Sequence, residues 1–165
     1  MTMFGFKKKH ELIDDERIFA VASGELIPLQ DVDDPVFSQG MMGRGYGVNP
    51  VENAVVQAPV FAKVTLVQGH AIGLERADGL QFLIHIGIDT VNLSGHPFKP
   101  IVAEGDIVEA GDELVKVDWN EITNHGLAKT VMVVMPNEQK LGAAVAINDQ
   151  VRNIEVGAEI GTATR

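Results

Sequence analysis

The stretch Gln81-Phe-Leu-Ile-His-Ile-Gly-Ile88 alternates between two kinds of position. Its even positions are all large and apolar, and a period of two is typical of a β-strand with one buried face; these residues are Phe82, Ile84, Ile86 and Ile88. His85 occupies an odd position and therefore points away from the core. We predict a strand over residues 82–88 whose second face presents a histidine.

A second strand is predicted over residues 70–75, shortly before the first. The Asp-Gly pair at positions 78–79 lies between the two strands and indicates a hairpin with a two-residue type I′ loop, because both loop residues of that turn need φ > 0. In that register Ile72 lies opposite His85, and His70 becomes a diagonal neighbour of His85 on the same face. Their Cα atoms are then expected about 7–8 Å apart, close enough for the imidazoles to meet.

Two histidines on one face, surrounded by Ile72, Leu74 and Leu83, form a candidate functional site. A lone strand histidine is more often a half-buried, hydrogen-bonded residue, so the prediction rests on the pair. Such a pair can bind a metal, act as general acid and base, or act as nucleophile and stabiliser. The residues alone leave these alternatives open.

At 165 residues, the chain is long enough for one domain with its own hydrophobic core. Its formal net charge of −10 argues against binding to nucleic acid, because phosphate contacts require a basic surface. The absence of cysteine excludes disulfides, thiolate ligands and thiol catalysis. The sequence also lacks a run of about 18 apolar residues, the length that a membrane-spanning helix requires.

Residues 1–17 are predicted to be a flexible leader, and residues 18–165 the folded domain. The leader carries Phe4 and Phe6 before Lys7-Lys8-Lys9, a pattern that allows peripheral contact with an anionic membrane at most. It lacks the apolar core of a signal peptide. These features favour a cytoplasmic location.

Glycine and proline punctuate the chain at the spacing of turns. Further strands are predicted at residues 18–22, 24–28, 46–49, 54–57, 62–66, 107–108, 113–117, 131–134, 151–154 and 160–162. Helical signals are sparse: Asp118 opens a capping box for a short helix that ends near His125, and residues 136–141 are predicted to form one further turn. Many short strands with few helices predict an all-β sandwich or barrel.

Residues 102–114 repeat the pair Gly-Asp at an interval of six residues, as Gly105-Asp106 and Gly111-Asp112. This segment resembles the compact turns of lipoyl and biotinyl carrier domains, whose fold is a barrel-sandwich hybrid. Those carriers present a modified lysine at the tip of a tight hairpin. No lysine stands at such a predicted tip here, so we do not expect a swinging-arm carrier.

Four segments carry a more specific resemblance: Val60-Phe-Ala-Lys63, Gly69-His-Ala71, Leu83-Ile-His-Ile-Gly-Ile-Asp-Thr-Val91 and Glu104-Gly-Asp-Ile-Val-Glu-Ala-Gly-Asp112. Together they resemble the glucose-family IIA proteins of the bacterial sugar phosphotransferase system. The resemblance runs from about residue 18 to the C-terminus. It implies a flattened antiparallel β-sandwich with a duplicated barrel-sandwich hybrid motif and one or two short helices.

The same resemblance implies a phosphotransferase component that needs no cofactor. His85 is expected to take a phosphoryl group on Nε2 from the phosphocarrier protein HPr and to pass it to a cysteine in the IIB domain of a sugar permease. His70 is expected to hydrogen-bond the phosphoryl group, and the Gly87 carbonyl to hold the other ring nitrogen of His85. Gln68 replaces a threonine that orients the upstream histidine in many relatives, and its amide is the candidate substitute.

The predicted docking surface for partner proteins has an apolar centre, formed by Val36, Phe37, Ile72, Leu74 and Leu83. Its predicted rim is acidic and consists of Asp33, Asp34 and Asp89. An apolar centre inside a charged rim is the usual anatomy of a transient interface.

Two alternative functions stay open at this point. One is a zinc hydrolase on a similar β-scaffold, and the other is a regulatory protein that only docks other proteins. A tight zinc site takes three or four protein ligands, so two histidines without any cysteine make an incomplete intrinsic site. A nucleophilic role needs less, because an imidazole with a pKa near 6.5 is already mostly neutral at pH 7.

Overall fold

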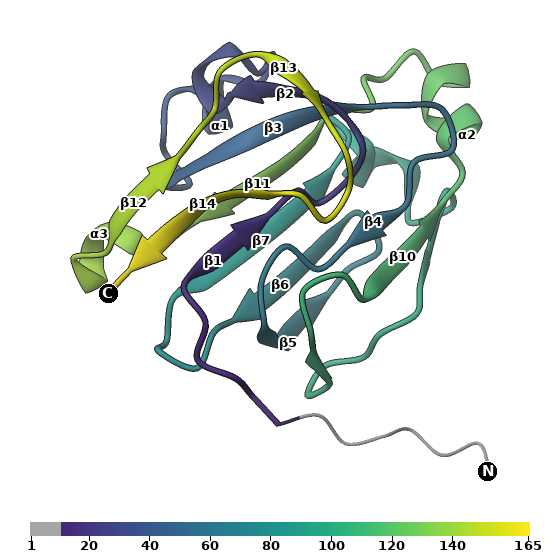
Figure 1. Cartoon of the computed structure of the whole chain (residues 1–165). Helices are drawn as coiled ribbons and strands as arrows, with labels where there is room; N and C mark the ends of the chain where they lie inside the picture. Colours follow the sequence, from purple (N-terminus) through teal and green to yellow (C-terminus); the bar gives the residue numbers. More distant parts are fainter. Residues whose placement is uncertain (1–10) are drawn as a thin grey trace, which may run out of the picture.

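The computed structural model describes residues 11–165 and shows a molecule built mostly from antiparallel strands (Figure 1). Its largest sheet has eight strands, in the spatial order β13 (Arg152–Ile154), β2 (Gly24–Pro28), β3 (Arg44–Pro50), β11 (Val131–Met135), β7 (Gln81–Ile86), β6 (Ala71–Glu75), β5 (Ala62–Val67) and β9 (Ile107–Val108). The strand that carries His85, β7, therefore lies inside this sheet, between β11 and β6.

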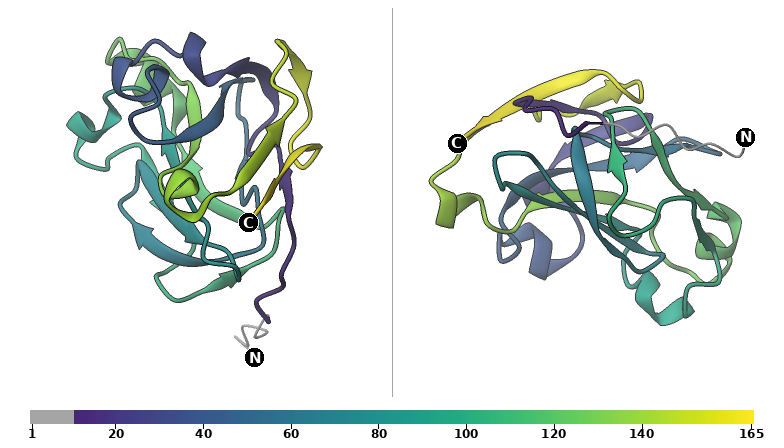
Figure 2. Two further views of the ribbon diagram at one scale, coloured as in Figure 1. Left: turned by 90° about the vertical axis from the view of Figure 1, so that its left-hand side faces the viewer. Right: turned by 90° about the horizontal axis from the view of Figure 1, so that it is seen from below.

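Two smaller sheets pack against one face of the large sheet. The first has the order β1 (Arg17–Phe19), β14 (Glu159–Thr164), β12 (Ala144–Ile147), and the second has the order β4 (Val56–Gln57), β10 (Glu113–Val117), β8 (Phe98–Pro100). The right-hand view of Figure 2 shows β12 and β14 as a separate layer over the other strands. The molecule is a flattened β-sandwich, so the predicted all-β fold class is confirmed.

The helices are short: α1 (Pro35–Ser38), α2 (Trp119–Asn124), α3 (Glu138–Leu141) and the 3-10 helices η1 (Leu29–Asp31) and η2 (Thr90–Leu93). The helix predicted after Asp118 is confirmed, and the Asp118 carboxylate begins α2 by accepting the Glu121 N–H at 3.2 Å. The predicted capping box is only half formed, because the Asp118 N–H donates to the Pro97 carbonyl at 2.7 Å and not to the Glu121 side chain. The turn predicted over residues 136–141 corresponds to α3. Within residues 11–165, no helix is long and apolar enough to cross a membrane.

Alternation along the central strands divides their side chains between two hydrophobic clusters. The main core lies between the large sheet and the two smaller ones, and it includes Phe82, Ile84 and Ile86 from β7. The second cluster lies on the opposite face, where η1 and α1 pack; it consists of Ile27, Leu29, Val32, Phe37, Ile88, Met132 and Val134. Ile88 was predicted to face the main core, but Gly87 has a φ of +78° and turns the chain at the end of β7.

The Gly-Asp repeat forms two equivalent turns. In each turn, the aspartate donates its main-chain N–H to the carbonyl three residues earlier, and its carboxylate accepts the N–H of that earlier residue; the pairs are Asp106 with Ala103 and Asp112 with Glu109. The glycine before each aspartate donates its N–H to a neighbouring segment: Gly105 to Val64 at 2.8 Å and Gly111 to Ala58 at 2.9 Å. The repeat in the sequence is therefore also a repeat in the structure.

The hairpin between β6 and β7 has a three-residue loop, and the predicted two-residue loop is wrong. Arg76 donates its N–H to the Leu80 carbonyl at 2.9 Å, and within the loop only Gly79 has a positive φ, at +90°. The Asp78 carboxylate accepts the Leu80 N–H at 3.2 Å and the Arg76 Nε–H at 3.1 Å. These side-chain bonds favour the longer loop, in which a glycine in the left-handed region completes the turn.

The extra loop residue shifts the hairpin register by one. Ala71 lies opposite His85, and Ile72 lies opposite Ile84. Ile72 and Leu74 therefore point into the main core, where both have an exposed fraction of 0%. The prediction that these two residues surround His85 is wrong, because a one-residue slip moves every side chain of a strand to the other face.

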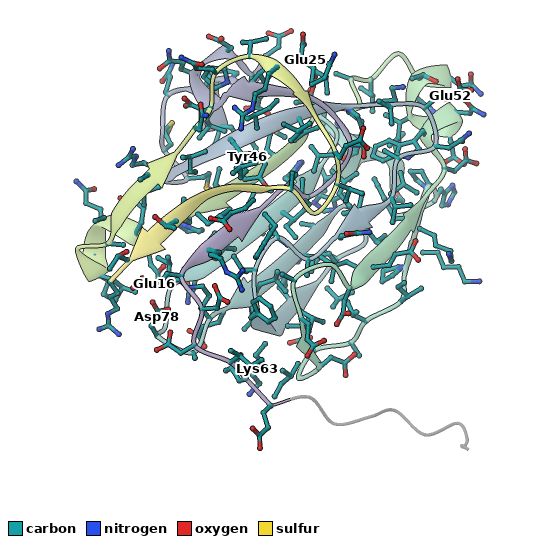
Figure 3. All side chains as sticks on the ribbon, in the orientation of Figure 1. Glu16, Glu25, Tyr46, Glu52, Lys63 and Asp78 are labelled. Carbon is teal, nitrogen blue, oxygen red and sulfur yellow. The ribbon has the colours of Figure 1, made fainter. Side chains whose placement is uncertain are left out.

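Arg76 ties this hairpin to both ends of the folded chain. Its guanidinium is buried and donates to the carbonyl of Glu16 at 3.5 Å and to the carbonyl of Ala163 at 2.8 Å, and it pairs with the Asp78 carboxylate. Figure 3 shows Glu16 and Asp78 at the same corner of the molecule. The leader was predicted over residues 1–17. Residues 1–10 of it lie outside the described residues, whereas its last residue, Arg17, is the first residue of β1.

Candidate functional site

The candidate site lies on the face of the large sheet that carries the second cluster. One row of directly paired residues crosses this face through five strands: Ile27, Gly47, Met132, His85 and Ala71. The next row consists of Gly45, Val134, Leu83 and Gly73. Four of these nine residues are glycine or alanine, so several positions around Leu83 and His85 on the sheet carry only a small side chain or none. Leu83 and His85 are therefore only half-buried.

His70 lies directly before β6, in the turn that leads out of β5. Gly69 in this turn has a φ of +66°, and the His70 carbonyl accepts the Ile86 N–H at 2.7 Å. The centroids of the His70 and His85 rings lie 5.1 Å apart, with the rings edge to face at 74°. The structure thus brings the two histidines together as predicted, but the turn at Gly69 positions His70, and not the predicted strand register. The turn places His70 on the face of His85, where a continued strand would have pointed it into the core.

One main-chain oxygen holds the ring of His85. Its Nδ1 lies 2.8 Å from the carbonyl oxygen of Gly87, which the resemblance had predicted. A carbonyl oxygen only accepts hydrogen bonds, so Nδ1 carries the proton of the neutral ring. The lone pair is then on Nε2, which has no hydrogen-bond partner among residues 11–165. Nε2 is therefore the ring atom of His85 that can act as a nucleophile.

Burial lowers the pKa of the His85 imidazole, and the neighbouring His70 lowers it further. The hydrogen bond to the Gly87 carbonyl and the negative charges of Asp34 and Asp89 act in the opposite direction, but the net shift is downward. His85 is therefore neutral at neutral pH, which is the state that a nucleophilic imidazole requires.

The short helix α1 places an aromatic ring against His85. Asp34 begins the helix by accepting the Val36 N–H at 3.0 Å, and Pro35 follows at the first helical position. The ring centroids of Phe37 and His85 lie 5.2 Å apart. Phe37 is buried, whereas 44% of Val36 is exposed. Phe37 thus packs against the nucleophile, and Val36 presents apolar surface to solvent beside it.

The remaining predicted site residues have different surroundings. Leu83 packs against the second cluster, while Asp33 and Asp89 are exposed. Gln68 is also exposed, and within the described part of the chain its side chain forms no hydrogen bond. The predicted contact between the Gln68 amide and His70 is therefore not present in this structure.

Two buried residues of this region, one in the neighbouring strand and one in the turn after β7, were not predicted. Met132 in β11 is directly opposite His85 and is fully buried. Thr90 is also fully buried, and its hydroxyl donates to the Ile86 carbonyl at 2.5 Å. The sequence gives no local signal for Met132, because the pairing of β7 with β11 joins distant segments. The buried position of Thr90 follows from the turn after Gly87, which alternation alone does not predict.

Residues 11–165 contain no group of three or more His, Cys, Asp or Glu side chains arranged to hold a metal ion. The rings of the two histidines contact each other, and the His85 ring also packs against Phe37. Nδ1 of His85 is held by the Gly87 carbonyl, and Nε2 has no partner in the described part of the chain, so the geometry favours the use of His85 as a nucleophile that His70 assists.

Known proteins are similar to this chain in sequence and in fold. Residues 16–141 match the family described as phosphoenolpyruvate-dependent sugar phosphotransferase system, EIIA 1. The chain belongs to this family. It is 40% identical over 147 residues to a PTS system glucose-specific EIIA component of Staphylococcus aureus (strain COL), which covers 88% of this chain and 87% of the relative. It is 39% identical over 137 residues to the protein of the same description from Staphylococcus epidermidis, covering 82% of each.

A solved structure, glucose permease IIA from Mycoplasma capricolum, superimposes with a TM-score of 0.78 at 29% sequence identity and covers 88% of this chain and 93% of that one. The chain is thus an EIIA component, a phosphocarrier of the sugar phosphotransferase system. These comparisons support neither the zinc hydrolase nor the purely regulatory docking protein.

Proposed function

We propose that His85 is the residue of this EIIA component that carries the phosphoryl group, that HPr supplies the group, and that the IIB domain of a sugar permease receives it. The observation that carries this proposal is the state of the His85 ring: Nδ1 is held by the Gly87 carbonyl, while Nε2 has no hydrogen-bond partner among residues 11–165. The carrier is residues 18–165, it acts in the cytoplasm, and it uses no cofactor. The curated relatives are named glucose-specific, and this favours a permease of the glucose type.

In the first step, the lone pair of His85 Nε2 attacks the phosphorus atom of phosphohistidine on HPr. The new N–P bond forms as the N–P bond of the donor breaks, and the electron pair of the broken bond returns to the donor imidazole. The proton on His85 Nδ1 stays in place throughout, because the Gly87 carbonyl continues to accept it. In the second step, a cysteine thiolate of the IIB domain attacks the phosphorus, and His85 regains its neutral ring.

His70 is placed to stabilise the group in transit. Its ring stands edge to face against that of His85 at 5.1 Å, so an N–H of His70 can reach oxygens of a phosphoryl group on Nε2. Phosphoryl transfer depends mainly on in-line positioning and on stabilisation of charge on the equatorial oxygens. A donor that stays in the carrier serves both transfers, and we expect the second to depend on it more strongly.

The surroundings of His85 fit a protein partner. Phe37 and Leu83 exclude water from one side of the ring, and exposed Val36 extends the apolar surface. Asp34 and Asp89 lie near enough for their negative charges to act on the His85 ring, and exposed Asp33 directly precedes Asp34 in the chain. Acidic groups attract a basic partner, and the apolar centre then supplies affinity.

Phosphate incorporation in a mixture of enzyme I, HPr and phosphoenolpyruvate tests this proposal. The wild-type protein should gain one phosphoryl group by intact mass, and His85→Gln should gain none, because the nucleophilic nitrogen is lost. His70→Gln should accept phosphate but fail to pass it to a IIB domain. His125→Gln, which changes an exposed histidine at the end of α2, is the matched control and should behave like wild type. Phosphate acceptance by His85→Gln, or equal loss of acceptance in the His85 and His70 variants, would contradict the proposed roles.

A further inference from the structure

The proposed function makes the Gly87 carbonyl the atom that determines which nitrogen of His85 is free. A carbonyl that moved away would release Nδ1–H, and the ring proton could then occupy Nε2, the atom that must attack phosphorus. We propose, on the basis of that function, that Thr90 is a positioning residue: its hydroxyl holds the turn that directs the Gly87 carbonyl to Nδ1 of His85.

The first support is the hydrogen bond itself. Thr90 Oγ1 donates to the Ile86 carbonyl at 2.5 Å, and the exposed fraction of Thr90 is 0%. A hydroxyl and a carbonyl buried together lose their bonds to water, so they remain in place only as partners. Ile86 is also the last residue of β7, where the regular ladder of the sheet ends. The hydroxyl of Thr90 thus holds the main chain in place at the point where the hydrogen bonds of the strand end.

The second support is the shape of the turn. Gly87 and Asp89 both have left-handed backbones, with φ of +78° and +61°. A Cβ on Gly87 would lie 2.4 Å from Cγ2 of Thr90, so the methyl group of Thr90 occupies the space that the absent side chain leaves. Glycine adopts the left-handed conformation readily, but the left-handed backbone at Asp89 is costly for an L-residue, so surrounding contacts must hold the turn. Thr90 supplies two of these contacts, one from its methyl and one from its hydroxyl.

The third support is that different hydrogen bonds hold the two sides of this turn. On one side, the N–H groups of Gly87 and Ile88 donate to the carbonyls of Thr130 and Ala128, at 2.9 and 3.0 Å. These main-chain bonds connect the turn to the segment that precedes β11. On the other side, the Thr90 hydroxyl closes the turn onto Ile86. Loss of the hydroxyl leaves the Ile86 carbonyl buried without its partner and frees that side of the turn to move.

Three variants separate the hydroxyl from the packing of the methyl group. Thr90→Val keeps the shape and removes the hydroxyl, whereas Thr90→Ser keeps the hydroxyl and removes the methyl. Tyr46→Phe is the matched control, because it deletes another fully buried hydroxyl that donates to a main-chain carbonyl, that of Phe19 at 3.0 Å. Tyr46, labelled in Figure 3, belongs to the main core on the other face of the sheet.

The direct readout is the tautomer of His85 in the unphosphorylated protein, observed by ¹⁵N NMR of the imidazole. Thr90→Val should raise the population with the proton on Nε2 and slow phosphate acceptance from HPr about tenfold, the effect of one lost hydrogen bond. Thr90→Ser should keep the wild-type tautomer and most of the rate. Tyr46→Phe should lose comparable stability to urea but keep both the tautomer and the rate.

A wild-type tautomer population in Thr90→Val would overturn the proposal, as would equal impairment in Thr90→Val and Thr90→Ser. If Thr90→Val does not fold, Thr90→Ser and Thr90→Ala provide a second pair that differs only in the hydroxyl, and the same tautomer comparison decides. Failure of the wild-type protein to accept phosphate would refute the proposed function separately, because the tautomer measurement requires no phosphoryl transfer.

Discussion

The two faces of the large sheet differ most clearly along β7, where successive side chains belong to different parts of the molecule. On one face, Phe82, Ile84 and Ile86 are at most 1% exposed and pack with side chains from all three sheets. On the other face, Leu83 and His85 are half-buried among glycines, alanine and one short helix. The first face forms the main core, and the second holds the histidine pair that we propose to be the phosphoryl-transfer site.

The difference also concerns the kind of interaction on each face. The core face is held by buried apolar area, which contributes about 25 cal/mol per Å² and depends little on any single atom. The site face depends on individual contacts, such as the 2.8 Å bond between His85 Nδ1 and the Gly87 carbonyl. Substitutions one residue apart on β7 should therefore affect different properties of the protein.

The largest effect on stability is expected from Ile84→Ala. Removal of this fully buried side chain should lower the free energy of unfolding by about 2–5 kcal/mol, through lost burial and the cavity that remains. Urea denaturation measures this loss. Phosphate acceptance, expressed per folded molecule, should stay at the wild-type rate. A fall in that rate would show that the two faces are energetically coupled.

Leu83→Asp, at the neighbouring residue, should have the opposite effect: a small change in stability and a large loss of affinity for HPr. Stability should change far less than in Ile84→Ala, because Leu83 is only half-buried. Affinity for HPr should fall by about 2 kcal/mol, roughly 30-fold, because a charge replaces an apolar contact in the desolvated centre of the interface. Isothermal titration with HPr tests this, with Leu83→Ala as the milder comparison. Unchanged affinity in Leu83→Asp would place the docking surface elsewhere.

A smaller effect is expected at the acidic rim. Asp89→Asn should slow association with a basic partner about two- to threefold and flatten its dependence on salt, while dissociation stays nearly constant. Stopped-flow kinetics at several ionic strengths measures both rates. If dissociation changes instead of association, Asp89 contacts the partner directly and does not act by attraction at a distance.

The smallest effect concerns pH. The folded pKa of His85 is lowered by burial, whereas the unfolded chain has a pKa of about 6.5. Between these two values the unfolded state binds more protons, so the contribution of His85 to stability should fall as the pH decreases through this window and stay level above it. His85→Gln should lack this component of the pH dependence. An NMR titration that shows a folded pKa above 6.5 would contradict this prediction, because the contribution of His85 to stability would then increase as the pH decreases.

Sequence reasoning predicted most strands and the position of His85, but not the pairing around it. The alternation of residues 82–86 sets which side chains of β7 face the core, and this local pattern requires no knowledge of other segments. The β6–β7 register failed because Arg76 and Asp78 form side-chain bonds that favour a longer loop. The strands β8 and β12 were not predicted.

By itself, then, the sequence determined that this chain is an all-β protein whose histidine faces away from the core, because period-two alternation and turn residues act over a few neighbouring positions. Only the tertiary structure decided what surrounds that histidine. Phe37 packs against the His85 ring from α1, Met132 lies opposite His85 in β11, and Thr90 holds the adjacent Ile86 carbonyl from the turn after Gly87. Their placement depends on long-range strand pairing and on one left-handed glycine, whose effects appear only when the whole sheet is assembled.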